Sequence, residues 1–157
     1  MSNAVKAVPD GYHSLTPYLT CKDTARAIEF YKKAFGAKLD MQMPGPDGKI
    51  IHAEIQIGNS KIFLGEECPG RSLAPDPNSS LAPVSIFFYT DNVDAVFDRA
   101  VQEGSKVAAP LQDQFWGDRF GKLVDPFGHH WALAQHIEDV APDEMKRRSD
   151  AAMAAAG

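Results

Sequence analysis

Cysteine is scarce in this chain, and its positions suit neither a disulfide framework nor a cysteine-based metal site. The two cysteines, Cys21 and Cys68, lie far apart, and neither has a second cysteine at metal-ligand spacing. No apolar run approaches the roughly 20 residues of a membrane-spanning helix, and the first residues lack the apolar core of a secretory signal. We therefore expect a cytoplasmic protein with reduced thiols and no membrane partner.

Dense positive charge is also missing. The sequence holds 16 basic and 21 acidic residues, for a net charge of −5, and its densest basic run is Lys146-Arg147-Arg148. Such a balance keeps a protein soluble and opposes binding to a phosphate backbone, so we expect no nucleic-acid partner. The chain does have 44% hydrophobic residues over 157 positions, which is enough to bury the core of one domain or of two fused half-domains.

The sequence repeats itself when it is shifted by 68 positions. The same order of predicted elements then recurs in both halves, which chance identity of single residues does not explain. The residues that coincide include Gly36-Ala37-Lys38-Leu39 with Gly104-Ser105-Lys106-Val107, Ile55 with Leu123, and Phe63 with Trp131.

Each half predicts one strand, one helix and three further strands. In the first half Asp23 is a suitable N-cap and Gly36 a suitable helix terminator. Residues 50–57 alternate apolar and polar side chains, which places His52 and Glu54 on one face of a strand. The predicted elements are strands over 15–20, 39–43, 50–57 and 61–64 and a helix over 24–35.

The second half follows the same order. Asp91 or Asn92 can cap a helix whose apolar residues recur at helical spacing, and Gly104 ends it. Residues 125–128, Asp-Pro-Phe-Gly, are typical of a type I turn between two strands. The predicted strands cover 84–90, 119–124 and 130–137, with one more near 107, and the apolar stripe of the helix is Val93, Val96, Phe97, Ala100 and Val101.

These elements predict an α+β fold made of two β-α-β-β-β modules. Module one covers 12–65, a linker rich in proline and serine covers 66–83, and module two covers 84–137. Residues 138–157 form a C-terminal helical extension, in which Pro142 suits the first turn of a helix.

Several strings of residues resemble a known family. Residues 24–31, Thr-Ala-Arg-Ala-Ile-Glu-Phe-Tyr, followed by Phe35-Gly36, resemble the first helix of the vicinal-oxygen-chelate superfamily of glyoxalases, bleomycin-resistance proteins and dioxygenases. Residues 114–119, Gln-Phe-Trp-Gly-Asp-Arg, and 125–129, Asp-Pro-Phe-Gly-His, resemble its PhnB-like branch. The resemblance covers 12–137 as a single domain and implies that the two modules form an open, eight-stranded cup.

The superfamily's metal enzymes hold one divalent ion in the cup with ligands from the first and fourth strands of each module. The resemblance puts these positions at about Thr16, Leu64, Ser85 and Ala132. Leucine and alanine offer no donor atom, and a hydroxyl alone is a weak ligand. We therefore expect no metal and no other cofactor, and neither glyoxalase I nor extradiol dioxygenase chemistry at the usual position.

Three residues are candidates for catalysis. His52 and Glu54 could act as acid and base in a polar wall of the cup, although an alternating strand more often turns such a face to water. If Ala132 faces the cup, His130 faces it too and can bind a ligand. The other interpretation of His130 is a hydrogen-bonded histidine beside the turn.

Aromatic residues and one arginine supply the candidate ligand-binding surface. Phe87 and Tyr89 alternate along one strand and Tyr18 lies on another, so inward-facing rings would line an aromatic pocket. The other role of such rings is core packing. Trp116 and Arg119 belong to a glycine-containing segment that either covers the pocket or forms a tight turn in which Arg119 pairs with the preceding aspartate.

The sequence favours a protein that binds a small aromatic or oxygenated molecule without a metal. The alternative is an enzyme of the lyase, isomerase or dioxygenase-like kind that uses His52, Glu54 or His130. We also expect a homodimer, because exposed sheet edges and apolar rims are usually covered and two-fold symmetry is the commonest arrangement. The terminal segment, with Met145 and Met153, would supply apolar contacts to the partner.

Overall fold

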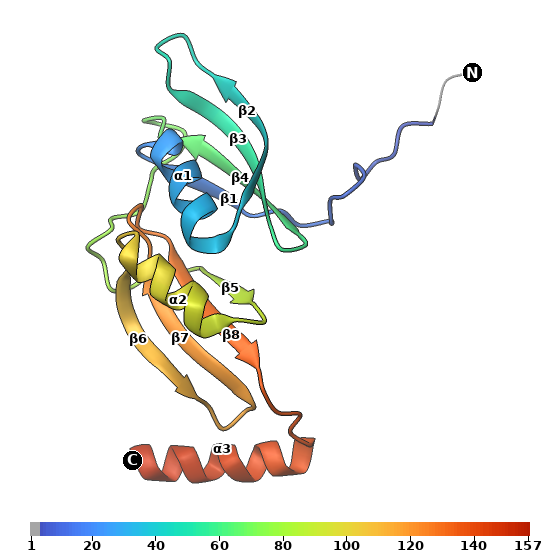
Figure 1. Cartoon of the computed structure of the whole chain (residues 1–157), viewed down its shortest axis with the longest axis vertical. Coiled ribbons are helices and arrows are strands. Elements are labelled where there is room, and N and C mark those ends of the chain that lie inside the picture. The colour runs from blue at the N-terminus through green and yellow to red at the C-terminus, as the bar shows by residue number, and fades with distance from the viewer. Residues whose placement is uncertain (1–3) are drawn as a thin grey trace. The chain divides into compact units, whose positions relative to one another are not determined.

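The computed structural model describes residues 4–157, which form two compact units divided between Asp76 and Pro77, inside the proline-rich segment 66–83. Each unit is one four-stranded sheet with a helix against one of its faces (Figure 1). The fold is therefore α+β, with eight strands in two sheets and a C-terminal helix, as predicted. None of the helices within 4–157 combines the length and the apolar character needed to cross a membrane.

The first unit contains five elements, and capping residues fix the ends of its helix. The carboxylate of Asp23 accepts a hydrogen bond from the backbone N–H of Arg26 at 3.1 Å, and Gly36 ends the helix at φ 67°. The first strand begins at Tyr18 rather than at the predicted Leu15, because Pro17 has no N–H to donate to a ladder. The elements are β1 (Tyr18–Cys21), α1 (Thr24–Phe35), β2 (Lys38–Pro44), β3 (Ile50–Ile57) and β4 (Ser60–Glu66), with the strands in the order β1-β4-β3-β2.

The second unit repeats this order and adds a terminal helix. Its elements are β5 (Ser85–Tyr89), α2 (Val93–Gln102), β6 (Lys106–Asp113), β7 (Asp118–Val124), β8 (His130–His136) and α3 (Pro142–Ala156), with the strands in the order β5-β8-β7-β6. Four residues of the predicted α2 stripe are buried, but Val101 is 38% exposed. At 3.6 residues per turn Val101 lies roughly 90° from the centre of the other four, so its inclusion in the stripe was wrong.

Every strand turns one face toward its helix and the other face away from it. The faces turned away carry polar and aromatic side chains, including half-buried His52 and Glu54 in the first unit and exposed Phe87 and Tyr89 in the second. We call these the open faces. The side chains on the helix faces are almost fully buried and include Ala53, Ile55 and Leu64 in the first unit and Leu123, Trp131 and Leu133 in the second.

The internal repeat changes its offset after the third strand of each unit. In the first sheet Ile55 pairs with Ile62, seven positions later (62 − 55). In the second sheet Leu123, the counterpart of Ile55, pairs with Trp131, eight positions later (131 − 123). The second unit therefore holds one extra residue between Leu123 and its partner, and Trp131 corresponds to Ile62.

The predicted match of Phe63 with Trp131 was wrong for this reason. Phe63 lies on the open face, whereas Trp131 is 1% exposed on the helix face. The counterpart of Ala132 is Phe63, and Leu64 corresponds to Leu133 and faces the helix. The fourth-strand position that we assigned to Leu64 therefore belongs to Phe63.

Asp125 organises the longer turn. The backbone N–H of Gly128 donates to the Asp125 carbonyl at 3.1 Å, which closes the predicted turn. The buried carboxylate of Asp125 accepts hydrogen bonds from the backbone N–H groups of Phe127 at 2.9 Å and His129 at 3.0 Å, and from Nε1–H of Trp131 at 2.8 Å. One carboxylate therefore joins the turn to the core beneath α2.

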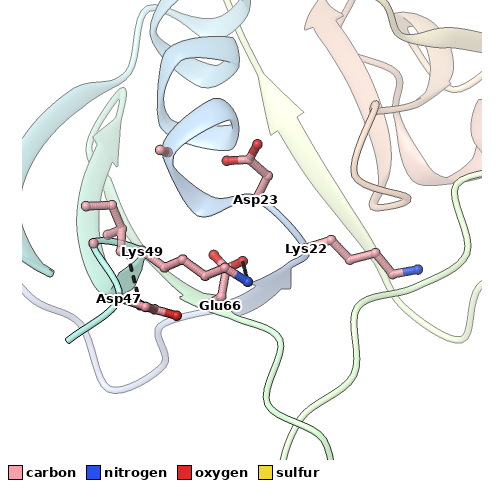
Figure 2. Close-up of a pocket in the computed structure, with 8 residues that line it drawn as sticks. Lys22, Asp23, Asp47, Lys49 and Glu66 are labelled. Atoms are coloured by element: carbon pink, nitrogen blue, oxygen red, sulfur yellow. Dashed lines mark hydrogen bonds and ion pairs between the residues drawn. The ribbon is translucent and has the colours of Figure 1, made fainter. Parts of the chain in front are cut away.

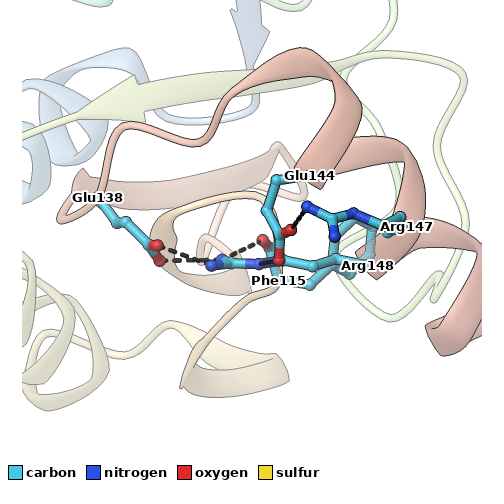
Figure 3. A network of polar contacts seen from close by, with 5 residues as sticks. All are labelled: Phe115, Glu138, Glu144, Arg147 and Arg148. Carbon is cyan, nitrogen blue, oxygen red and sulfur yellow. Dashed lines mark hydrogen bonds and ion pairs between the residues drawn. The ribbon is translucent and has the colours of Figure 1, made fainter.

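α3 begins at Pro142, as predicted, but it is held by charge rather than by apolar packing, because none of its residues is buried. Arg148 lies at the centre of this network (Figure 3). Its guanidinium donates to Glu138 at 2.8 and 3.0 Å, to Glu144 at 3.0 Å and to the carbonyl of Phe115 at 3.1 Å. These bonds tie the helix to the segment that precedes β7.

The Asp125 contacts lead to a stability prediction. Substitution Asp125→Ala leaves buried N–H groups without acceptors, so the free energy of unfolding should fall by about 3 to 5 kcal/mol, measured by urea denaturation. The control is Asp47→Ala, in an exposed turn where the carboxylate accepts one backbone hydrogen bond, and it should cost less than about 1 kcal/mol. Equal losses in the two variants would contradict the role of Asp125.

Candidate functional site

The open face of the first sheet carries a continuous chain of four polar side chains. The hydroxyl of Tyr18 lies 3.0 Å from Nδ1 of His52, and Nε2 of His52 lies 3.4 Å from Oε1 of Glu54. The hydroxyl of Tyr12 donates to Oε2 of the same carboxylate. A neutral imidazole with its proton on Nε2 satisfies both of its contacts, since Nδ1 then accepts and Nε2 donates.

Phe63 forms the apolar floor of this chain. Its ring centroid lies 5.9 Å from those of Tyr12 and Tyr18 and 5.2 Å from that of His52. Gly65 gives Tyr18 room, because a Cβ at this position would come within 2.6 Å of the Tyr18 hydroxyl. The absence of a side chain at Gly65 therefore leaves the space that the Tyr18 ring occupies.

A cavity of about 560 Å³ lies beside Glu54, between the open face and the N-terminal segment. The hydrogen bond to the Glu54 carboxylate, together with burial and the charge of that carboxylate, raises the pKa of Tyr12 to about 12. Tyr12 therefore stays a neutral donor. The residues that line the cavity are Ala7, Val8, Pro9, Tyr12, His13, Ser14, Thr16, Glu54 and Phe63.

The open face of the second sheet carries a group of rings in mutual contact, which we call the ring platform and define as Phe87, Tyr89, Trp116 and Phe120. Phe87 lies 4.9 Å from Tyr89 and 5.7 Å from Phe120, and Trp116 lies 5.5 Å from Phe120, all between ring centroids. Ala134 lies beneath the rings and is fully buried. Phe87 and Tyr89 remain 47% and 58% exposed, so the platform presents aromatic surface outward.

A buried carboxylate holds one end of the platform in place. Asp118 accepts hydrogen bonds from the Tyr89 hydroxyl at 2.8 Å and from Trp116 Nε1–H at 3.0 Å, and lies 2.9 Å from His136 Nδ1. Burial works to raise the pKa of Asp118, but the hydrogen bonds from His136, Tyr89 and Trp116 outweigh it and lower the pKa. Sequence reasoning missed this role, although Asp118 stands two residues before Phe120 and so shares its face.

Arg119 lies on the other face of β7 and does not contact Asp118. Its Nε and Nη2 donate to Asp94 of α2 at 2.8 to 3.1 Å, and its Nη1 donates to Asp113 at 3.1 Å. The predicted pairing of Arg119 with the preceding aspartate is therefore not what holds this segment. The structure thus brings Phe87, Tyr89 and Trp116 together and places Arg119 apart from them.

His130 begins β8 on the open face of the second sheet, beside Ser85 of β5. Its Nε2 atom is enclosed and has no hydrogen-bond partner among the described residues. This nitrogen therefore makes no hydrogen bond of the kind that the interpretation of His130 as a turn histidine requires.

A smaller cavity of about 330 Å³ lies at the start of α1 (Figure 2). Its carboxylates are engaged by the protein itself. Glu66 accepts from the backbone N–H of Thr24 at 3.0 Å and lies 3.9 Å from Lys49 Nζ, and Asp47 accepts from the backbone N–H of Lys49 at 3.1 Å. These contacts cap the helix and close a turn.

The amino-acid sequence matches the family model of the Glyoxalase/Bleomycin resistance protein/Dioxygenase superfamily over residues 12–133. The chain belongs to this superfamily. The uncharacterized Mycobacterium bovis protein Mb0911c is 43% identical over 137 residues, which cover 85% of this chain and 90% of that protein.

Two solved structures share the fold. TioX from Micromonospora sp. ML1 has a TM-score of 0.63 at 24% identity, covering 80% of this chain and 99% of TioX. The PhnB protein from Bacillus cereus has a TM-score of 0.62 at 19% identity, covering 78% of this chain and 99% of PhnB, in line with the PhnB-like motifs.

The superfamily's metal positions lack a donor set in this chain. With the corrected register, the positions that the resemblance implies for a metal are Thr16, Phe63, Ser85 and Ala132, which offer two hydroxyls and no imidazole, carboxylate or thiolate. Within residues 4–157 no group of three or more His, Cys, Asp or Glu side chains could hold a metal ion. The residues present therefore do not fit a divalent ion at that place.

Protein purified without added metal should contain no stoichiometric divalent ion, because two hydroxyls alone bind such ions weakly. Elemental analysis of purified protein measures this, with a sample incubated with zinc and then desalted as a control for retention. Near one equivalent of zinc, nickel, manganese or iron, bound at these strands, would show that the donor argument is wrong.

His136 predicts a pH-dependent contribution to stability. Hydrogen bonds to Asp139 and then Asp118 raise the pKa of His136. A histidine with a raised pKa stabilises the folded state fully below its unfolded pKa of about 6.5. The contribution disappears as the pH rises through the folded-state pKa.

The stability of the unsubstituted chain relative to His136→Gln should therefore be largest below about pH 6 and decline toward alkaline pH, measured by urea denaturation at each pH. In an NMR titration, Asp139→Asn should lower the pKa of His136 because it removes the first of the two carboxylates. A stability difference that grew with pH would contradict this assignment.

Proposed function

We propose that the chain is a small-molecule-binding protein that holds an aromatic or oxygenated molecule on the ring platform, without a metal. The observation that carries this proposal is the exposure of Phe87 and Tyr89 on a face where their neighbours on β8, Ala132 and Ala134, are buried. A sheet that needed these rings only for its core would enclose them. Rings left exposed in one contiguous group favour an aromatic ligand.

The surroundings of the platform supply polar contacts for such a ligand. Lys122 Nζ lies 5.9 Å from the centroid of the Phe120 ring and provides one positive charge. The Tyr89 hydroxyl donates to Asp118 and keeps its oxygen available as an acceptor. An aromatic molecule with an oxygen or carboxylate substituent therefore matches this surface.

The test uses 2-naphthoate as the probe and calorimetric titration as the measurement. Substitution Phe87→Ala should weaken its binding about three- to tenfold, since a stacked ring pair contributes about 0.5 to 1.5 kcal/mol beyond its area. Cyclohexanecarboxylate, which has no aromatic ring, should bind more weakly than 2-naphthoate to the unsubstituted protein.

The matched control is Val107→Ala, which removes a similarly exposed apolar side chain from β6 outside the platform. It should leave binding of 2-naphthoate within about twofold of the unsubstituted chain. Equal binding by the Phe87→Ala variant and the control would contradict the platform as the binding site.

The second candidate is an enzyme of the lyase, isomerase or dioxygenase-like kind that uses His52, Glu54 or His130. The observation that favours it is the chain from Tyr18 through His52 to Glu54, which could pass a proton along a half-buried path. A binding protein returns its ligand unchanged, so conversion of a bound compound that stops in His52→Gln would decide for the enzyme.

A further inference from the structure

We propose that the cavity beside Glu54 in the first unit binds an organic cation, with an ammonium group on the carboxylate and an apolar or aromatic body against Tyr12 and Phe63. This site uses residues of a different unit from the ring platform. It goes beyond the proposed function and does not depend on it.

The charge in the cavity favours a cation. Among the described residues that line the cavity, Glu54 is the only Asp, Glu, Lys or Arg. Its carboxylate contacts the Tyr12 hydroxyl and the imidazole of His52 rather than a lysine or arginine. Lys61 stands 5.5 Å from the centroid of the Tyr12 ring, but its ammonium is paired with Asp40 at 2.6 Å. Within residues 4–157 no lysine or arginine pairs with the Glu54 carboxylate, so the cavity presents the negative charge of this side chain.

The carboxylate of Glu54 can accept more hydrogen bonds than Tyr12 and His52 supply. An ionised carboxylate has about four acceptor positions, and Tyr12 and His52 occupy one on each oxygen. The side chain is 20% exposed, so the remaining positions can be reached from the cavity. An ammonium group brings the donors that complete this set, whereas a carboxylate ligand would be repelled.

The aromatic and apolar residues that line the cavity suit the body of an organic cation. The Tyr12 and Phe63 rings meet at an interplanar angle of 53° with their centroids 5.9 Å apart, and they flank the carboxylate. Aromatic faces attract a cation that lies within about 6 Å of the ring centroid. Val8 and Pro9 add apolar surface for the body of a ligand, and about 560 Å³ is within the usual size of small-molecule sites.

The test compares three probes of nearly equal shape: 1-naphthylmethylammonium, 1-naphthylmethanol and 1-naphthoate. Titrations are made at pH 8, where histidine side chains are ordinarily neutral. At this cavity, read from the amide NMR signals of its lining residues Tyr12, Ser14 and Phe63, the ammonium should bind at least about tenfold more tightly than the alcohol, and the carboxylate should bind most weakly of the three. In Glu54→Gln, which keeps an acceptor for Tyr12, the preference for the ammonium over the alcohol should disappear.

The matched control is Glu29→Gln, which removes one negative charge from an exposed position on α1, on the other side of the same sheet. This variant should keep the preference for the ammonium within about twofold. A preference that survives in Glu54→Gln, or that Glu29→Gln also abolishes, would overturn the proposal.

A second measurement needs no variant. In amide NMR spectra of the unsubstituted chain, the ammonium probe should shift the signals of Tyr12, Ser14 and Phe63, which line the cavity. Shifts confined to residues of the second unit, or no difference between the ammonium and the alcohol, would overturn the proposal. Binding of 2-naphthoate to the platform is measured separately, so either proposal can fail while the other stands.

Discussion

The packing of one helix against one face of each sheet decides which face of the sheet each strand side chain occupies. Because strand side chains alternate, burial of Ala53 and Ile55 beneath α1 sends His52 and Glu54 to the open face. A slip of one residue would bury a histidine and a carboxylate and expose the core, which makes the register strongly specified. The candidate residues therefore lie on the open face because their apolar neighbours along the strand are buried against the helix. The candidates take no part in that packing.

Local signals were sufficient to predict the elements, and they failed where a single residue was inserted. Capping by Asp23 and alternation along β3 act over a few residues, and the structure confirms both. The repeat was compared at one constant offset, which cannot detect the extra residue between β7 and β8. The constant offset therefore matched Ala132 with Leu64, whereas the structure matches it with Phe63.

An asparagine or a glycine cannot replace Asp125 in that turn, because both carboxylate oxygens of Asp125 accept hydrogen bonds.

The candidate sites were predicted only in part, because each includes a residue outside the helices and strands, Tyr12 in the first unit and Trp116 in the second. Alternation alone placed His52 and Glu54 on one face. Tyr12, which completes their chain, lies in a segment whose path is set by contacts with Glu54 and Lys61 that no local pattern encodes. Arg119 was grouped with the pocket because it is a charged neighbour of Trp116. Its place in β7 turns it toward α2, where Asp94 is its partner.

The two units keep the same chemistry on their helix faces and differ on their open faces. At the shared offset of 68, Ile55 corresponds to Leu123, and both are buried apolar side chains. At the same offset Glu54 corresponds to Lys122, so the charge on the open face changes sign. Glu54 lies among hydroxyl and imidazole donors, whereas Lys122 lies over the Phe120 ring. Since the helix faces build most of each core, the open faces are free to differ, and their opposite charges favour ligand groups of opposite sign. One repeated fold thus offers a cation-binding face in one unit and a ring platform beside a lysine in the other.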